Sequence, residues 1–184
     1  MKRTCCLNLP SLPASIPLLL FTLLCSALPG AAKRPSDVHD ALWHHRNLGK
    51  AYYENPMTQL KAVEEFKQAV ALAPDSARDR VNYGLALLRS GMTKESVTEL
   101  AKAQKQDPSI PHTWFSLVLA YKKAFDHESA IAQFEGLLKL VPNEPVTHYN
   151  LGIEYKLLGK SAQALQQFEI AARLNPNFAA PHFQ

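Results

Sequence analysis

Apolar residues recur at spacings of three and four through most of the chain beyond residue 40, and short polar segments interrupt them. This spacing places the apolar side chains on one face of a helix, so it predicts pairs of amphipathic helices joined by short turns. In the segment 143–176, the pattern predicts one helix near Val146–Leu158 and a second near Ala162–Leu174. Gly159 lies between them, where a residue that tolerates a left-handed backbone can end the first helix.

The helical pattern repeats with a period of 34 residues. The period is marked by prolines at equal spacing, namely Pro74, Pro108, Pro142 and Pro176. Each proline lies just past a predicted second helix, and it ends that helix because it lacks the amide donor. The first unit is one residue longer, because its turn near Asn55 holds an extra residue. The predicted units are 40–74, 75–108, 109–142 and 143–176.

Alignment of the units places residues of similar size in the same column. One column of the first helix holds a glycine in three units, namely Gly49, Gly84 and Gly152, and Val118 in the third unit. These glycines let the first helix approach the second. Small residues do the same from the second helix, at Ala62, Ser96, Ala130 and Ala164. Bulky residues fill the space between repeats, at Phe66, Leu100, Phe134 and Phe168. The residues after the prolines are candidate caps for the next helix, namely Asp75, Ser109 and Asn143.

This pattern resembles the tetratricopeptide repeat family over residues 40–176. The third unit carries most of the family's spaced signature, with Trp114, Leu117, Tyr121, Ala130, Phe134 and Pro142. The fourth carries it with Leu151, Gly152, Tyr155, Ala164, Phe168, Ala171 and Pro176. The resemblance implies an all-α fold, a right-handed superhelical solenoid of antiparallel helix–turn–helix hairpins, whose concave groove binds peptides or proteins. A helical bundle with accidental spacing is the alternative.

Residues 1–32 form a segment of a different kind. A basic start precedes an apolar run, and small residues follow it, which predicts a secretory signal peptide cleaved after Ala27 or Ala32. An uncleaved membrane anchor is the alternative, but Pro17 interrupts an apolar run that is shorter than the ~20 residues a spanning helix needs. Residues 33–39 are then a short linker, and the chain is expected to be exported, either to a periplasm or out of the cell.

Composition narrows the function classes. With 47% hydrophobic and 20% charged residues, the chain is too apolar to be a disordered tail. The net charge of +4 includes two basic residues of the leader, so the remainder is nearly neutral and gives no reason to expect a nucleic-acid partner. A membrane partner is expected only if the leader is uncleaved. All cysteines, namely Cys5, Cys6 and Cys25, lie in the leader. The rest of the sequence can therefore form no disulfide and no thiolate metal site.

Motifs for catalysis or cofactor binding are weak, so we expect a non-enzymatic protein with no cofactor. Gly159-Lys160-Ser161 lacks the earlier glycine of a phosphate-binding loop, and His127-Glu128 lacks the second histidine of a zinc protease motif. His39, Asp40, His44 and His45 cluster near the start of the first helix. Asp40 and His44 are four residues apart and share a helical face, so they could place two ligands on a metal. The spacing supplies no third ligand, so a solvated first helix is the preferred interpretation.

The family resemblance places binding residues on the first helix of each hairpin, on the face away from the second. Transferred to this chain, the set is basic, amide-bearing and aromatic: Arg46, Asn47, Lys50, Tyr53, Asn82, Leu85, Arg89, Phe115, Lys122, Lys123, Tyr149, Asn150, Ile153 and Lys156. It suits a protein or an extended peptide that is acidic with interspersed apolar residues. The family's clamp for a C-terminal carboxylate is matched at Asn82 but not at Lys50, so that ligand is not predicted. The alternative is that these residues are merely a solvated surface.

Two hypotheses of function follow. In the first, the chain is a free-standing scaffold or adaptor that binds a protein in its groove. In the second, it is the N-terminal interaction module of a longer exported protein whose activity, enzymatic or not, lies beyond residue 184. Residues 177–184 place Pro181 and His182 in phase with the start of the earlier units, so we expect them to begin a fifth, truncated repeat.

Overall fold

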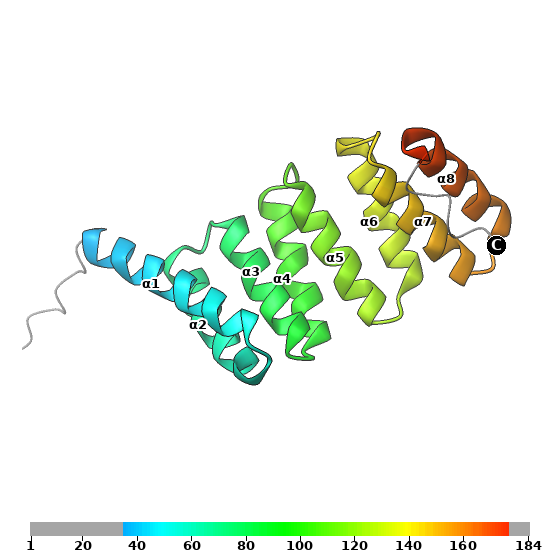
Figure 1. Cartoon of the computed structure of the whole chain (residues 1–184). Helices are drawn as coiled ribbons and strands as arrows, with labels where there is room; N and C mark the ends of the chain where they lie inside the picture. Colours follow the sequence, from blue (N-terminus) through cyan, green and yellow to red (C-terminus); the bar gives the residue numbers. More distant parts are fainter. Residues whose placement is uncertain (1–34, 177–184) are drawn as a thin grey trace, which may run out of the picture. The chain divides into compact units, whose positions relative to one another are not determined.

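The computed structural model describes residues 35–176, which form helices and no strand (Figure 1). A short 3-10 helix, η1 (Pro56–Thr58), precedes the second α-helix. The α-helices of this part of the chain are α1 (Pro35–Glu54), α2 (Gln59–Leu72), α3 (Ala77–Arg89), α4 (Thr93–Gln106), α5 (Pro111–Lys123), α6 (His127–Leu140), α7 (Pro145–Leu157) and α8 (Ser161–Leu174). The helices predicted for the fourth unit agree with α7 and α8 to within one residue at each end.

Consecutive helices pair into antiparallel hairpins, and each hairpin packs on the next. The pairs α1–α2, α3–α4, α5–α6 and α7–α8 make the hairpins, while α2–α3, α4–α5 and α6–α7 join one hairpin to the following one. The turns inside the hairpins lie along one edge of this row, and the connections between hairpins lie along the other (Figure 1). The predicted all-α solenoid of helical hairpins is therefore confirmed.

The turns inside the last three hairpins share one backbone geometry. Gly91 and Gly159 have positive φ angles of 86° and 71°, and Phe125 holds the same place in the third hairpin with a φ of 58°. The residue after each of these donates its amide to a carbonyl five residues earlier, as in Asp126 N to Tyr121 O at 3.0 Å. Left-handed backbone is strained for a residue with a side chain, by roughly 1–2 kcal/mol. Gly159 was predicted to end its helix in this way, and Phe125 stands where the other two turns have glycine.

Close approach of the two helices in a hairpin depends on the small-residue columns. A Cβ added at Gly84 would lie 2.6 Å from Leu100, and one added at Gly152 would lie 2.7 Å from Phe168. Either contact would force the helices apart. In the third hairpin the glycine lies on the second helix instead of the first. Gly136 on α6 leaves room for the ring of Trp114 from α5.

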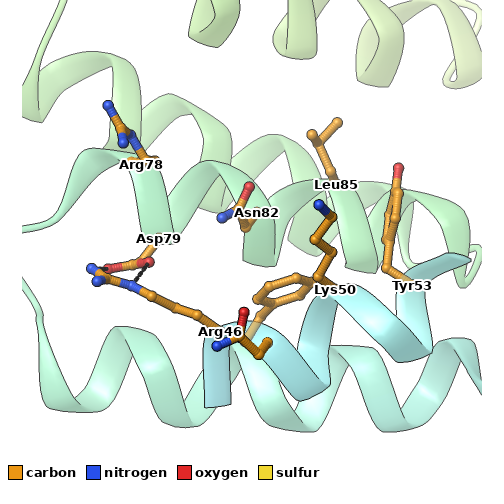
Figure 2. Close-up of a pocket in the computed structure, with 9 residues that line it drawn as sticks. Arg46, Lys50, Tyr53, Arg78, Asp79, Asn82 and Leu85 are labelled. Atoms are coloured by element: carbon orange, nitrogen blue, oxygen red, sulfur yellow. Dashed lines mark hydrogen bonds and ion pairs between the residues drawn. The ribbon is translucent and has the colours of Figure 1, made fainter. Parts of the chain in front are cut away.

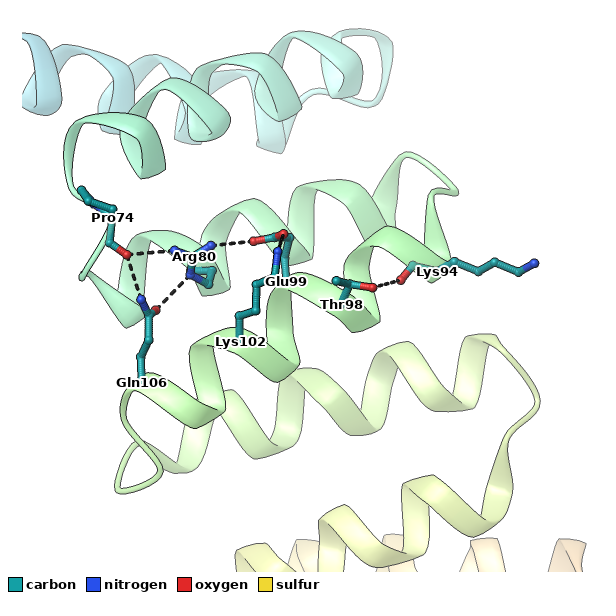
Figure 3. A network of polar contacts seen from close by, with 7 residues as sticks. All are labelled: Pro74, Arg80, Lys94, Thr98, Glu99, Lys102 and Gln106. Atoms are coloured by element: carbon teal, nitrogen blue, oxygen red, sulfur yellow. Dashed lines mark hydrogen bonds and ion pairs between the residues drawn. The ribbon is translucent and has the colours of Figure 1, made fainter.

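The loop prolines accept a recurring hydrogen bond. The side chain six residues later donates to the proline carbonyl in each of three hairpins: Arg80 Nη2 to Pro74 O at 2.8 Å, Trp114 Nε1 to Pro108 O at 2.8 Å, and His148 Nε2 to Pro142 O at 3.0 Å. In the second hairpin the bond belongs to a wider network with Glu99, Lys102 and Gln106 (Figure 3). Three unlike side chains thus satisfy a carbonyl that the preceding helix leaves without an amide donor.

Two boundaries differ from the sequence-based expectation. Helix α1 begins at Pro35, inside the segment 33–39 that was expected to be a linker, because proline and an acidic first turn favour a helix start. The predicted caps are each one residue early. The residues at the cap positions are Ser76, Ile110 and Glu144, and of these Ser76 and Glu144 accept hydrogen bonds from amides of the first turn.

The leader and the expected fifth repeat lie outside the described residues, at 1–34 and 177–184. Within the part that the structure describes, no helix has the length and apolar character needed to cross a membrane.

Candidate functional site

A pocket of about 420 Å³ opens between α1 and α3. We call it the first pocket (Figure 2); its lining residues are Arg46, Asn47, Lys50, Tyr53, Phe66, Arg78, Asp79, Asn82 and Leu85. Most of the groove residues predicted on the first two hairpins are among them. The pocket therefore combines cationic and amide groups with the apolar side chains of Phe66 and Leu85.

Asp79 carries a negative charge at the wall of the first pocket, and Arg46 compensates it. Its side chain is 1% exposed, and Arg46 donates to its two oxygens from Nε at 2.7 Å and from Nη2 at 2.5 Å. Hydrogen bonding to Asp79 raises the pKa of Arg46, so the guanidinium stays charged. The pair joins the first hairpin to the second. Removing Arg46 would leave a buried carboxylate uncompensated, which typically costs about 3–5 kcal/mol.

The remaining polar groups of the first pocket are available to a ligand. Among the side chains drawn in Figure 2, hydrogen bonds join only Arg46 and Asp79, while Lys50, Arg78 and Asn82 make none with the others. Asn47 differs, because its amide nitrogen donates to Trp43 O at 2.9 Å. Two cations and one amide are therefore left to meet an incoming carboxylate.

Arg89 extends the basic surface beyond the first pocket. Its guanidinium carbon lies 4.9 Å from the ring centroid of Tyr53, which itself lines the pocket. The negative face of the ring attracts the cation, and this contact restricts the position of the Arg89 side chain. Arg89 and Tyr53 therefore form a preordered rim at the α1–α3 junction.

A second pocket, of about 340 Å³, lies between the third and fourth hairpins and is mostly apolar. Of the predicted groove residues it includes Phe115, which is 36% exposed. Its lining residues are Pro111, His112, Phe115, Leu137, Val141, Glu144, Val146 and Thr147. The first and second pockets thus offer different chemistry, one cationic and polar, the other suited to an apolar side chain.

Lys122 and Lys123, predicted as groove cations, both hold structural contacts. Lys122 Nζ lies 3.0 Å from Glu154 Oε1, and His127 Nδ1 lies 2.8 Å from the other oxygen of Glu154. Lys123 Nζ donates to Leu88 O at 2.6 Å, at the end of α3. Because Glu154 is fully buried, Lys122 compensates its charge inside the hairpin stack, and His127 adds a hydrogen bond. Both lysines link neighbouring hairpins and contribute less to the groove than the sequence suggested.

The predicted residues on α7 are spread over different surroundings. The ring of Tyr149 lies 5.5 Å from that of Phe168 on α8, and the amide of Asn150 donates to Val146 O on its own helix. Ile153 is half-buried, whereas Lys156 is exposed in the last turn of α7. The structure therefore does not gather these four residues into one site.

No cluster of metal-ligating residues is present within residues 35–176. Of the histidines near the start of α1, His45 pairs with Glu65 of α2 through a 2.6 Å contact, and the ring of His44 packs edge-on against that of His45. His127 binds Glu154 at the start of α6, and Gly159 lies in a turn between helices. The structure thus places the Gly159 motif in a turn and the His127 motif at the start of a helix.

Sequence reasoning missed two buried acids and Arg78. Asp79 occupies the column of Thr113 and Thr147, and Glu154 occupies a column held by alanine in the second and third units. An acid in a column that otherwise holds small or hydroxyl-bearing residues could have indicated a buried charge with a basic partner, since such columns face neighbouring hairpins. Both acids are compensated by basic groups of the preceding hairpin.

Comparison with known proteins supports the same architecture. The sequence model of the tetratricopeptide repeat matches residues 146–178. A crystal structure of MamA protein is 22% identical to this chain, covering 82% of this chain and 79% of its own, with a TM-score of 0.67. A second MamA structure, labelled AMB-1, is 27% identical over 77% of this chain and 80% of its own, with a TM-score of 0.65.

A tetratricopeptide repeat protein from Parabacteroides merdae is 18% identical, over 74% of this chain and 54% of its own, with a TM-score of 0.68. No curated protein shows significant sequence similarity. At these identities the structural likeness carries the fold, and the repeat match assigns the fourth hairpin to its sequence family.

Proposed function

We propose that this chain, whose fold is that of tetratricopeptide repeat solenoids and whose fourth hairpin matches the repeat, is a non-enzymatic scaffold that holds a protein segment against its odd-numbered helices. The observation that carries the proposal is the first pocket, to which the first helices of two consecutive hairpins contribute. A scaffold needs a surface that is formed before the partner arrives, and Arg46 and Asp79 fix the relation of these two helices.

The preferred segment is acidic, with apolar residues spaced along it. Asp79 is compensated by Arg46, so the outward charge of the first pocket comes from Lys50 and Arg78. Several like charges around a concavity reinforce one another and attract an opposite charge. Phe115 and the second pocket supply contact area for an apolar side chain.

A peptide-display selection on the full chain tests this proposal. We expect the enriched peptides to carry Asp or Glu together with aliphatic or aromatic residues. Binding of one synthesised peptide, measured by fluorescence anisotropy, should weaken about tenfold in Lys50→Glu, because one attractive charge becomes repulsive. It should also weaken as salt rises toward ~0.5 M.

The matched control is Lys105→Glu, which makes the same charge reversal on the exposed surface of α4. Equal affinities of the two variants, or enrichment of basic peptides, would contradict the proposal. Lys122→Glu is unsuitable as a probe, because the new carboxylate would face the buried Glu154 and disturb the fold.

The chain is further proposed to act in an exported compartment after loss of its leader, on the strength of the sequence of residues 1–32. The mass of the chain recovered from the periplasm of an expressing bacterium tests this. A chain that begins at Leu28 or Lys33 is expected, whereas an intact chain confined to the cytoplasm would overturn it.

A further inference from the structure

The first and second pockets are equivalent sites, two hairpins apart on the same face of the row. Val146 lines the second pocket and lies two repeats of 34 residues after Arg78, which lines the first. Phe115 of the second pocket likewise occupies on α5 the place that Arg46 of the first pocket holds on α1. Two cationic side chains of the first pocket are thus replaced by apolar ones in the second.

An apolar strip connects the two pockets. Leu85 lines the first pocket and packs against a cluster that contains Leu117 and Ala120 of α5. Leu119 lies one repeat after Leu85 and is 40% exposed on α5. It is four residues from Phe115, so the two side chains share a face of that helix. A segment that leaves the first pocket along this face therefore meets apolar surface until it reaches the second.

The charges at the two pockets have opposite signs. Lys50 and Arg78 give the first pocket its outward positive charge, while the exposed acids nearest to them in sequence, Glu54 and Asp75, do not line it. Glu144 places a carboxylate at the wall of the second pocket, where it accepts amides of the first turn of α7. An acidic residue of a ligand is therefore attracted to the first pocket and disfavoured in the second.

We propose that the two pockets bind one extended segment at two points, with a carboxylate in the first pocket and a bulky apolar side chain in the second. This inference rests on the proposed scaffold function and specifies its ligand. Packed helices lie about 8–10 Å apart, so two hairpin steps separate the pockets by roughly 16–20 Å. An extended chain advances about 3.3 Å per residue, which places the two anchor residues about six positions apart.

Fluorescence anisotropy of synthetic peptides with the full chain tests the spacing. Each peptide carries one Glu and one Phe among Ser and Thr residues, about two, six or ten positions apart and in either order. A spacer that is too short cannot reach both pockets. We therefore expect the six-position peptide of the favoured order to bind about tenfold tighter than the two-position peptide. The ten-position peptide should lie between them, since longer spacers lower the effective concentration gradually.

Double-mutant cycles assign each anchor to its pocket. Val146→Ser makes the second pocket more polar at a partly exposed position, and it should weaken the six-position peptide about fivefold. It should hardly affect the same peptide with Ala in place of Phe. Lys50→Glu should show the same non-additivity with a peptide that carries Gln in place of Glu. Leu60→Ser, on α2 and 70% exposed, is the matched control and should leave binding unchanged.

The outcomes separate this inference from the scaffold proposal. Equal affinities at all spacings in both orders would overturn two-point binding, and so would additive effects of Val146→Ser and of the loss of Phe. In either case the scaffold proposal would stand if Lys50→Glu still weakened binding. A parent chain that binds none of these peptides would overturn both proposals.

Discussion

At the scale of single residues, Phe125 shows how one position can work against the stability of its own turn. Its φ of 58° lies in the region that Gly91 and Gly159 adopt without strain. We expect Phe125→Gly to raise the free energy of unfolding by about 1 kcal/mol, because the strain of the Cβ is removed. Urea unfolding followed by circular dichroism measures this difference.

Phe125→Ala separates the two contributions of that residue. Alanine removes the ring but keeps the Cβ, and therefore keeps the backbone strain. We expect its stability to stay close to that of the parent, since the ring is 83% exposed. A gain in Phe125→Ala as large as that in Phe125→Gly would show that the ring, rather than the backbone, is unfavourable.

The candidate groove was only partly predictable at this scale. The sequence predicts that Lys50 and Asn82 share one surface, because helical periodicity determines which residues share a side, and both residues line the first pocket. It does not show which cations are already engaged. Lys122 is held by Glu154, an acid of the next hairpin, and a helix taken alone gives no sign of such a partner. Charged side chains on helices are usually solvated. That Lys122 is instead engaged becomes visible only when the third and fourth hairpins are packed together.

At the scale of elements, the network around Glu99 ties α3 to α4. Arg80 Nη1 and Lys102 Nζ each donate to a different oxygen of Glu99 at 2.7 Å, and Arg80 also reaches Pro74 O at the end of the preceding hairpin (Figure 3). Burial would raise the pKa of Glu99, but the hydrogen bonds from Lys102 and Arg80 outweigh it and leave the pKa lowered.

This network predicts a loss of stability in acid. A carboxyl whose pKa is lower in the folded state stabilises the fold above its unfolded pKa of about 4.3, and this stabilisation is lost as the pH falls through the folded value. Parent and Glu99→Gln should therefore differ in unfolding free energy near pH 6 and converge near ~pH 3. A difference that persists unchanged in acid would show that the charge of Glu99 is not responsible.

The ends of the helices were predictable where one residue type, proline or glycine, terminates the helix. The loop prolines and the turn glycines mark helix ends correctly, since each acts through its own backbone. The caps were placed one residue early, because Ser109 is a good cap by type yet bonds to Asp107 instead, while Ile110 stands at the cap position. Choosing between adjacent polar residues depends on the loop conformation, which the sequence pattern does not determine.

At the scale of the whole molecule, the period of 34 residues determined the fold, because each hairpin repeats the same contacts with its neighbours. The distribution of chemistry along the row was less regular. The first pocket is cationic and the second is apolar, although both lie between consecutive hairpins. A scaffold built this way distinguishes the two ends of a bound segment, so a ligand should bind in one direction.

The most direct test of the scaffold account is amide chemical-shift mapping of the full chain with a selected acidic peptide. The account predicts the largest changes on α1 and α3, at Lys50, Arg78 and Asn82 around the first pocket, with little change at Lys94 and Lys105 on α4. Largest changes on α4, or none around the first pocket at a saturating peptide concentration, would contradict it.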